Sequence, residues 1–293
     1  MKKLSKIWMD GKMVDWDKAQ VHVLSHSLHY GSGVFEGIRF YMTDKGPAIF
    51  RLREHIDRLF YSAKAMHMKL PYKKSQIIEA CKEIVRVNGL KEGYIRPLAF
   101  YGLGMGIDPR PIKINVAVAA WEWPAYLGDK PVKVKTAKFI RIHPDSTIAD
   151  AKISGHYVNS IVAKLSVKNC DEALLLDYKG NIAEGPGANF FIVRGRRLIT
   201  PKLGTILAGI TRQTIITIAE DLGYQVVEKE LKLKDLEDAE EAFFCGTAAE
   251  VSQVKSVDRI KFKKGALAKQ IKRQYLAAVH GEIKKYRRWL SYC

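Results

Sequence analysis

The residue of this chain best suited to covalent chemistry is a lysine in small and aromatic surroundings. Lys152 stands in "DAKISGHYVNS", the stretch 150–160, whereas most other lysines stand among further charges. Small neighbours would let its amine approach a bound ring and act as a nucleophile. Spacing alone does not separate Lys152 from the other lysines, so a solvated cation remains the alternative.

A first glycine-bent stretch could bind an anion. In "LAGIT", which runs from Leu207 to Thr211, Gly209 directly precedes a predicted helix. The amides of Ile210 and Thr211, the Thr211 hydroxyl and the helix dipole could meet a phosphate there. The same pattern is also typical of a plain helix cap without a ligand.

A second such stretch follows a predicted strand. In "FCGTAAE", Gly246 permits a tight bend, and the amides of Thr247 and Ala248 with the Thr247 hydroxyl could form an anion-binding nest. This motif, too, is a weak indication when it stands alone.

One carboxylate has unusual company. Glu184 lies in "NIAEGPGANFF", where Gly185 and Gly187 clear space directly after a predicted strand. A solvated turn carboxylate is the ordinary interpretation. The alternative is a carboxylate that faces a heterocyclic ring nitrogen and keeps it protonated.

The N-terminal half predicts two hairpins, two helices and two strands. Asp10-Gly11 marks a type I′ turn, and Gly46-Pro47 marks a second turn. Apolar residues at helical spacing predict helices over 53–68 and 77–88, the second ended by Gly89. Strand-like periodicity then covers 93–102 and 114–123.

The C-terminal half predicts strands that alternate with helices. The expected elements are a strand over 132–140, a helix over 157–166, a strand, turn and returning strand over 172–185, a hairpin around Gly195, a helix over 211–222 ended by Gly223, and an amphipathic helix within 268–286.

These elements predict an α+β protein of two domains. The prolines and glycine of 124–131 indicate a linker, which separates a small N-terminal domain, 1–123, from a large C-terminal domain, 132–293. Antiparallel meanders with helices set against them, in both halves, favour a ligand site between the domains.

The charge balance leaves three readings open. A net charge of +18 suits nucleic acid, an anionic metabolite or a lysine-rich surface. Twelve Lys or Arg lie between Lys255 and Arg288, but on a segment with helical apolar spacing, which favours the solvated face of a helix. Abundant Lys with Glu also suits a thermophile.

Export, membrane insertion and metal binding are not indicated. No apolar run approaches the roughly 18 residues of a membrane span, and the first residues do not form an apolar signal core. The four cysteines at 81, 170, 245 and 293 form no CxxC pair, so neither a metal site nor a disulfide framework is expected. We expect a cytoplasmic protein.

The order of these stretches resembles a known family. "VLSHSLHYGSGVFEGIRFY", "FRLREHIDRLFYSA", "GYIRPLAFYGLGMGI", "DAKISGHYVNS", "AEGPGANFFIV", "LAGITRQTI" and "CGTAAEV" occur in this sequence at intervals similar to those of the branched-chain amino acid aminotransferases, which are class IV pyridoxal-phosphate enzymes. The resemblance covers nearly the whole chain. It implies fold type IV, with antiparallel-rich sheets, flanking helices and pyridoxal 5'-phosphate between the domains.

The resemblance also implies roles at the cofactor. Lys152 matches the lysine that binds pyridoxal phosphate covalently and later carries the substrate proton, and Tyr157 matches the tyrosine at the phenolic oxygen. Glu184 matches the partner of the pyridine nitrogen, which makes the ring a better electron sink. The residues matched to the phosphate or to the face of the ring are Arg58, Leu207, Gly209, Ile210, Thr211, Gly246 and Thr247.

For the substrate, the resemblance implies one pocket for two side chains. Thr247 and Ala248 match the turn that holds the α-carboxylate, and Arg96 matches the arginine for the distal carboxylate of glutamate. An arginine beside apolar walls would let one pocket accept leucine and glutamate. The residues matched to those surroundings are Tyr30, which in the family comes from a second subunit, Phe35, Gly37, Tyr94 and Trp123.

The expected activity is therefore ping-pong transfer of the amino group from L-leucine, L-isoleucine or L-valine to 2-oxoglutarate. The expected partners are small amino acids and 2-oxo acids, and a second copy of the chain in a dimer or larger homo-oligomer, a hexamer included. Neither nucleic acid nor membrane is an expected partner. A D-amino acid or (R)-amine transaminase and a lyase that releases 4-aminobenzoate are the alternatives within the superfamily, and a basic nucleic-acid-binding protein is the alternative outside it.

Overall fold

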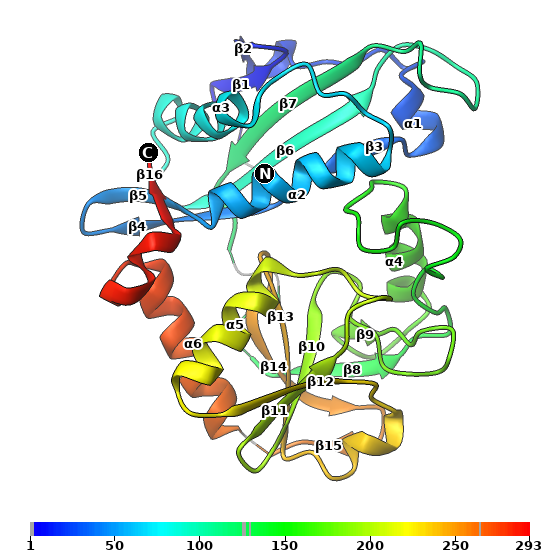
Figure 1. Cartoon of the computed structure of the whole chain (residues 1–293), viewed down its shortest axis with the longest axis vertical. Helices are drawn as coiled ribbons and strands as arrows, with labels where there is room; N and C mark the ends of the chain where they lie inside the picture. Colours follow the sequence, from blue (N-terminus) through cyan, green and yellow to red (C-terminus); the bar gives the residue numbers. More distant parts are fainter. Residues whose placement is uncertain (1–2, 125–126, 129, 264) are drawn as a thin grey trace. The chain divides into compact units, whose positions relative to one another are not determined.

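A computed structural model describes residues 3–124, 127–128, 130–263 and 265–293 (Figure 1). The chain forms two compact units. The first unit comprises Met1–Pro124, Ala151–His156 and Ala278–Cys293, and the second comprises Ala125–Asp150 and Tyr157–Ala277. The expected linker at 124–131 includes 125–126 and 129, which lie outside the described residues.

The units do not follow the expected division of the sequence. We assigned 151–156 and 278–293 to the C-terminal domain, but both segments pack in the first unit. The reason is strand pairing, because Ile153 bridges to Val34 and the C-terminal strand β16 (Leu290–Tyr292) pairs with β5 (Gly46–Phe50). Lys152 therefore belongs to the first unit.

One antiparallel sheet organises the first unit. Its strand order is β16-β5-β4-β6-β7-β1-β2, and β3 pairs with β6. The further strands are β1 (Lys6–Met9), β2 (Lys12–Asp15), β3 (Gly33–Phe35), β4 (Ile38–Thr43), β6 (Gly93–Tyr101) and β7 (Ile114–Trp121). The helices are α1 (His26–Tyr30), α2 (Leu52–Ala65) and α3 (Lys74–Val87), with a short 3-10 helix η1 (Trp16–Lys18) after β2 and η3 (Lys284–Trp289) before β16.

Local sequence explains most of these elements. Asp10 and Gly11 both adopt positive φ, as a two-residue hairpin turn requires, so the first hairpin is confirmed. The second hairpin and both predicted helices are confirmed as well, although α2 ends at Ala65 and not at 68. In α2, Ile56, Leu59 and Ala63 recur at helical spacing and are buried in the core.

The second unit also has an eight-stranded sheet, but a mixed one. The order is β12-β11-β10-β13-β14-β8-β9, and β15 pairs with β14. The strands are β8 (Val132–Thr136), β9 (Glu172–Leu174), β10 (Asn189–Arg194), β11 (Arg197–Pro201), β12 (Gln225–Lys229), β13 (Glu241–Gly246), β14 (Glu250–Val257) and β15 (Ile260–Lys261). The pairs β11 with β12, β14 with β8 and β8 with β9 are parallel, so the purely antiparallel meander expected in this half is corrected.

Three helices and a 3-10 turn complete this part of the chain: α4 (His156–Leu165), α5 (Ile210–Asp221), α6 (Ala266–Val279) and η2 (Leu233–Leu236). The strand expected over 132–140 is shorter, ending at Thr136, and the returning strand before 185 is reduced to isolated bridges. The C-terminal helix is amphipathic as predicted, with Ile271 and Tyr275 buried, but it ends at Val279 before Gly281 adopts positive φ.

No helix among the described residues is both long and apolar enough to cross a membrane.

Candidate active site

The backbone of Lys152 is held in the first unit from two sides. Its carbonyl accepts a hydrogen bond from the amide of Phe35 at 3.2 Å, and its amide donates to the hydroxyl of Ser62 at 2.9 Å. The side chain is partly buried, with Nζ 4.8 Å from the centroid of the Phe35 ring. Lys152 is therefore a positioned amine and not a solvated surface cation.

Helix α2 supplies a polar stripe beneath this amine. His55, Arg58 and Ser62 are spaced by three and four residues, so they share one face of the helix. His55 and Ser62 are buried, and Arg58 is nearly so. This face turns polar groups toward Lys152 where the neighbouring face of α2 packs in the apolar core.

Glu36 is the charged centre of that stripe. It is fully buried, its Oε1 accepts from Nε of Arg58 at 2.6 Å, and its Oε2 accepts from Nη2 of Arg58 at 3.0 Å. His55 Nδ1 lies 2.7 Å from Oε2. Although burial opposes ionisation, the charges and hydrogen bonds of Arg58 and His55 hold the pKa of Glu36 well below its usual range. Burial lowers the pKa of His55, so the imidazole is neutral and donates its Nδ1 proton.

Aromatic side chains surround Arg96 on the same unit. The Arg96 guanidinium carbon lies 4.6 Å from the ring centroid of Phe35, 5.6 Å from that of Tyr94 and 5.8 Å from that of Trp121. Trp123 packs edge to face on Tyr94 at 4.8 Å. The buried Nε of Arg96 has no hydrogen-bond partner among the described residues. An unpaired guanidinium nitrogen in an aromatic setting suits an incoming carboxylate.

Gly37 makes room for one member of this cluster. A Cβ atom at Gly37 would lie 1.7 Å from Oη of Tyr94, so any side chain would displace the tyrosine ring. The structure thus brings together the predicted residues Phe35, Gly37, Tyr94, Arg96 and Trp123 close to Lys152.

Tyr30 is not part of that cluster within one chain. Its side chain is 43% exposed, and its ring packs 4.4 Å from that of His26 on α1. A single chain leaves Tyr30 on the surface, where a neighbouring copy could meet it.

In the second unit, Glu184 is the centre of a hydrogen-bond network. It is buried, its Oε1 accepts from Nε of Arg141 at 2.6 Å, and its Oε2 accepts from Nδ2 of Asn189 at 3.0 Å. The Leu207 amide lies 3.3 Å from both oxygens. Glu184 is therefore not the solvated turn carboxylate of the ordinary interpretation.

The two predicted anion corners are also in the second unit. Gly209 is the N-cap of α5, so the amides of Ile210 and Thr211 begin the helix without intrahelical partners. Gly246 ends β13 and leads into the turn of Thr247 and Ala248. Asn189 links the first corner to Glu184, because its Nδ2 also donates to the Leu207 carbonyl at 3.0 Å.

Tyr157 lies in the first turn of α4 and is partly buried. The second unit thus brings Glu184, Leu207 and Gly209 together around Asn189. We keep the roles of Tyr157, Thr211, Gly246, Thr247 and Ala248 toward a ligand as predictions.

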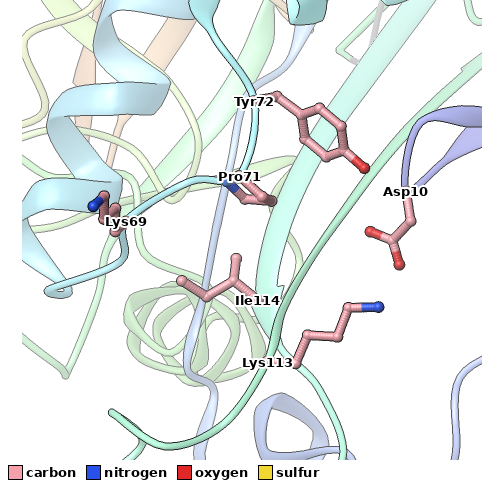
Figure 2. Close-up of a pocket in the computed structure, with 6 residues that line it drawn as sticks. All are labelled: Asp10, Lys69, Pro71, Tyr72, Lys113 and Ile114. Atoms are coloured by element: carbon pink, nitrogen blue, oxygen red, sulfur yellow. The ribbon is translucent and has the colours of Figure 1, made fainter.

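The hollows described on the first unit lie away from these residues. One has a volume of about 270 Å³ and is lined by Asp10, Lys69, Pro71, Tyr72, Lys113 and Ile114 (Figure 2). Another is lined by residues of the β4–β5 turn and of the segment 280–287. Neither contains a predicted site residue. Among the described residues, no cluster of His, Cys, Asp or Glu could hold a metal ion.

Several residues of these networks were missed by the sequence analysis. Trp121 stands two residues before Trp123, and strand alternation would have placed both on one face. His55 and Ser62 carry the helical spacing of Arg58. For Glu36, Arg141 and Asn189 the sequence has no local signal, because their partners lie far along the chain.

Comparisons with known proteins place this geometry in a family. The family model of the class IV amino-transferases matches residues 33–257, and the chain belongs to this family. A branched-chain-amino-acid aminotransferase of Pseudomonas aeruginosa is 43% identical, with 97% of this chain and 95% of that protein covered.

Solved structures agree over the full length. A branched-chain aminotransferase from Thermoproteus uzoniensis, with norvaline, has a TM-score of 0.96 at 41% identity and covers 98% of this chain and 99% of its own. A branched-chain amino acid aminotransferase from T.th., complexed with N-(5'-phosphopyridoxyl)-L-glutamate, has a TM-score of 0.96 at 44% identity and covers 100% and 99%. The expected α+β aminotransferase fold is confirmed.

Proposed function

We propose that this chain is a branched-chain amino acid aminotransferase, which uses pyridoxal phosphate to move the amino group of L-leucine, L-isoleucine or L-valine to 2-oxoglutarate. One observation carries the proposal: the amine of Lys152 and the guanidinium of Arg96 both lie on the ring of Phe35, at 4.8 and 4.6 Å from its centroid. A nucleophilic amine and a carboxylate receptor beside apolar walls match an amino acid substrate. Relatives that carry this activity by name extend over nearly the whole chain.

The donors and acceptors of the chain fit the cofactor. A carboxylate offers about four lone-pair sites, and Glu184 uses three of them on Arg141, Asn189 and the Leu207 amide, which leaves capacity for one N–H donor such as a pyridinium. Arg58 and the first amides of α5 at Ile210 and Thr211 suit a phosphate. Lys152 suits the aldehyde.

When bound, pyridoxal phosphate supplies the electron sink that stabilises negative charge at the substrate α-carbon. The chain's own residues do the rest. Lys152 accepts the proton from the α-carbon and returns it on the opposite side of the reaction. Glu184 keeps the pyridine nitrogen protonated, and Tyr157 donates to the phenolic oxygen.

Substrate binding is divided between charged and apolar groups. Thr247 and Ala248 present amides to the α-carboxylate. Phe35, Tyr94 and Trp123 enclose an aliphatic side chain, whereas Arg96 receives the distal carboxylate of glutamate. Its buried Nε, without a partner among the described residues, supports this last role.

Separate half-reactions test the proposal. Purified protein saturated with pyridoxal phosphate and mixed with L-leucine alone should release one equivalent of 2-oxo acid and lose its visible absorption band. Adding 2-oxoglutarate should then restore the band and produce glutamate. Release of 2-oxo acid only from D-amino acids, or amine transfer only from (R)-amines, would favour the alternative transaminases and refute the L-branched-chain assignment.

A homo-oligomer is part of the proposal. Two loops of the first unit lie side by side, since the Gly104 amide donates to the Leu24 carbonyl at 3.2 Å and His26 Nε2 contacts the Gly106 carbonyl at 2.6 Å. Together with α1 they expose an apolar patch of Val23, Leu24, Leu28, Leu103, Met105 and Ile107 next to Tyr30. Exposed apolar patches of this kind mark interfaces. A charged Ile107→Asp variant should shift light-scattering mass toward the monomer, whereas Val87→Asp should not.

A cytoplasmic location and adaptation to heat remain part of the proposal as well. Cys81 and Cys245 are buried free thiols, as suits a reducing compartment. Abundant Lys and Glu suit a protein that works hot, and a thermal unfolding midpoint above ~80 °C would support this, since mesophile domains cluster at lower values.

A further inference from the structure

The Glu36 carboxylate is an unusual neighbour for a phosphate-binding arginine. It is fully buried, whereas the Arg58 side chain keeps 12% of its surface exposed, so Arg58 forms the boundary between the buried cluster and the outside. Its Nε and Nη2 edge is occupied by Glu36. A phosphate bound to Arg58 would therefore meet the Nη1 end of the guanidinium.

Stability alone does not explain this cluster. A buried ion pair is often no more stabilising than well-packed apolar residues of similar volume, because both charges lose their hydration. Glu36, His55 and Arg58 nevertheless sit beside a large apolar core. A use that needs the charge is the better explanation.

Orientation is the use that the contacts support. Arginine has several rotatable bonds, and immobilising such a side chain opposes binding. Two charge-assisted hydrogen bonds to a carboxylate that cannot move fix the guanidinium plane before any ligand arrives. His55 fixes the carboxylate in turn, since its neutral ring donates to Oε2 without adding a competing charge.

We propose that Glu36, held by His55, is a positioning residue that orients Arg58 for the phosphate group of the cofactor. This inference rests on the proposed function, because it takes pyridoxal phosphate as the ligand. It predicts that Glu36 strengthens phosphate binding, even though its own charge repels a phosphate.

Charge and orientation make opposite predictions for Glu36→Gln. If repulsion dominated, removing the carboxylate would leave Arg58 with its full positive charge and tighten phosphate binding. If orientation dominates, the loosened guanidinium weakens phosphate binding by on the order of tenfold, the cost of immobilising one flexible side chain. We expect the second result.

Equilibrium dialysis of the full chain against pyridoxal phosphate and against pyridoxal isolates the phosphate contribution. The quantity of interest is the ratio of the two dissociation constants, because both ligands react with the same lysine. We expect Glu36→Gln to lower this ratio by about tenfold relative to the unsubstituted protein. Glu54→Gln is the matched control on α2, since Glu54 pairs with Arg51 at 2.5 Å, one turn away, and should leave the ratio unchanged.

A second pair of variants keeps the test decisive if Glu36→Gln does not fold. His55→Asn retains a side-chain N–H donor for Glu36, whereas His55→Leu removes it. The ratio should stay near that of the unsubstituted protein in the first variant and fall in the second.

The outcomes separate the two claims. An unsubstituted protein that binds neither ligand refutes the proposed function. A protein that binds both, with a ratio in Glu36→Gln that is unchanged or raised, refutes the positioning role while leaving the function intact. Equal weakening of pyridoxal and pyridoxal phosphate would also refute it, because Glu36 would then serve only the structure of the unit.

Discussion

Gly209→Ala is expected to disrupt the network that holds Glu184. A Cβ atom at position 209 would lie 2.0 Å from Oδ1 of Asn189 and 3.1 Å from its Cγ. Asn189 cannot simply swing away, because it is buried and donates both to Glu184 and to the Leu207 carbonyl. The added methyl group must therefore break one or both of these bonds.

The magnitude follows from what Asn189 loses. A hydrogen bond to a charged group contributes about 1.5–3 kcal/mol, and a neutral one about 0.5–1.5 kcal/mol. Removing an unfolded-state glycine returns about 0.4–1 kcal/mol. We expect Gly209→Ala to lower the free energy of unfolding by about 1–3 kcal/mol, taking the loss of both bonds with partial relaxation.

Urea unfolding of the ligand-free chain, followed by tryptophan fluorescence, measures this loss. Gly187→Ala is the control, because position 187 has ordinary φ and no atom within 4 Å of a built Cβ. It should be neutral or slightly stabilising. Equal unfolding free energies for Gly209→Ala and Gly187→Ala would show that Asn189 is not fixed as described.

Three further substitutions probe the first unit. Arg96→Gln should raise KM for 2-oxoglutarate about tenfold or more while changing KM for L-leucine little, since only the former loses a charged hydrogen bond; equal changes in steady-state KM would remove Arg96 from the distal carboxylate. Because burial lowers the pKa of His55, the folded chain binds fewer protons there than the unfolded chain, whose pKa is about 6.5. Stability should therefore fall as pH drops below about 6.5, and His55→Asn should flatten that part of the urea midpoint curve; an identical slope in both proteins would contradict a neutral, buried imidazole. Ser62→Ala leaves the Lys152 amide without its acceptor and should cost about 1 kcal/mol of unfolding free energy, whereas an unchanged value would show that Ser62 does not anchor Lys152.

Short-range features were predictable from the sequence. The turn at Asp10-Gly11, the hairpin around Gly195 and the start of α5 after Gly209 all depend on residues close together in the chain, and all are confirmed. Apolar spacing predicted α2, α3 and α5 for the same reason.

Long-range pairing was not predictable in this way. Nothing in "DAKISGHYVNS" indicates that Ile153 bridges to Val34, or that Lys152 leaves the rest of the C-terminal half to join the first unit. The parallel pairing of β8 with β14 likewise joins strands more than a hundred residues apart. The site residues were predicted from a resemblance, whereas the supporting residues Glu36, Arg141 and Asn189 emerge only when their partners are seen.

Borohydride reduction of the cofactor-loaded protein, followed by peptide mass mapping, tests the central claim most directly. The account predicts one phosphopyridoxyl adduct, located at Lys152, and none in Lys152→Ala. An adduct at another lysine, or one that persists undiminished in Lys152→Ala, would contradict it.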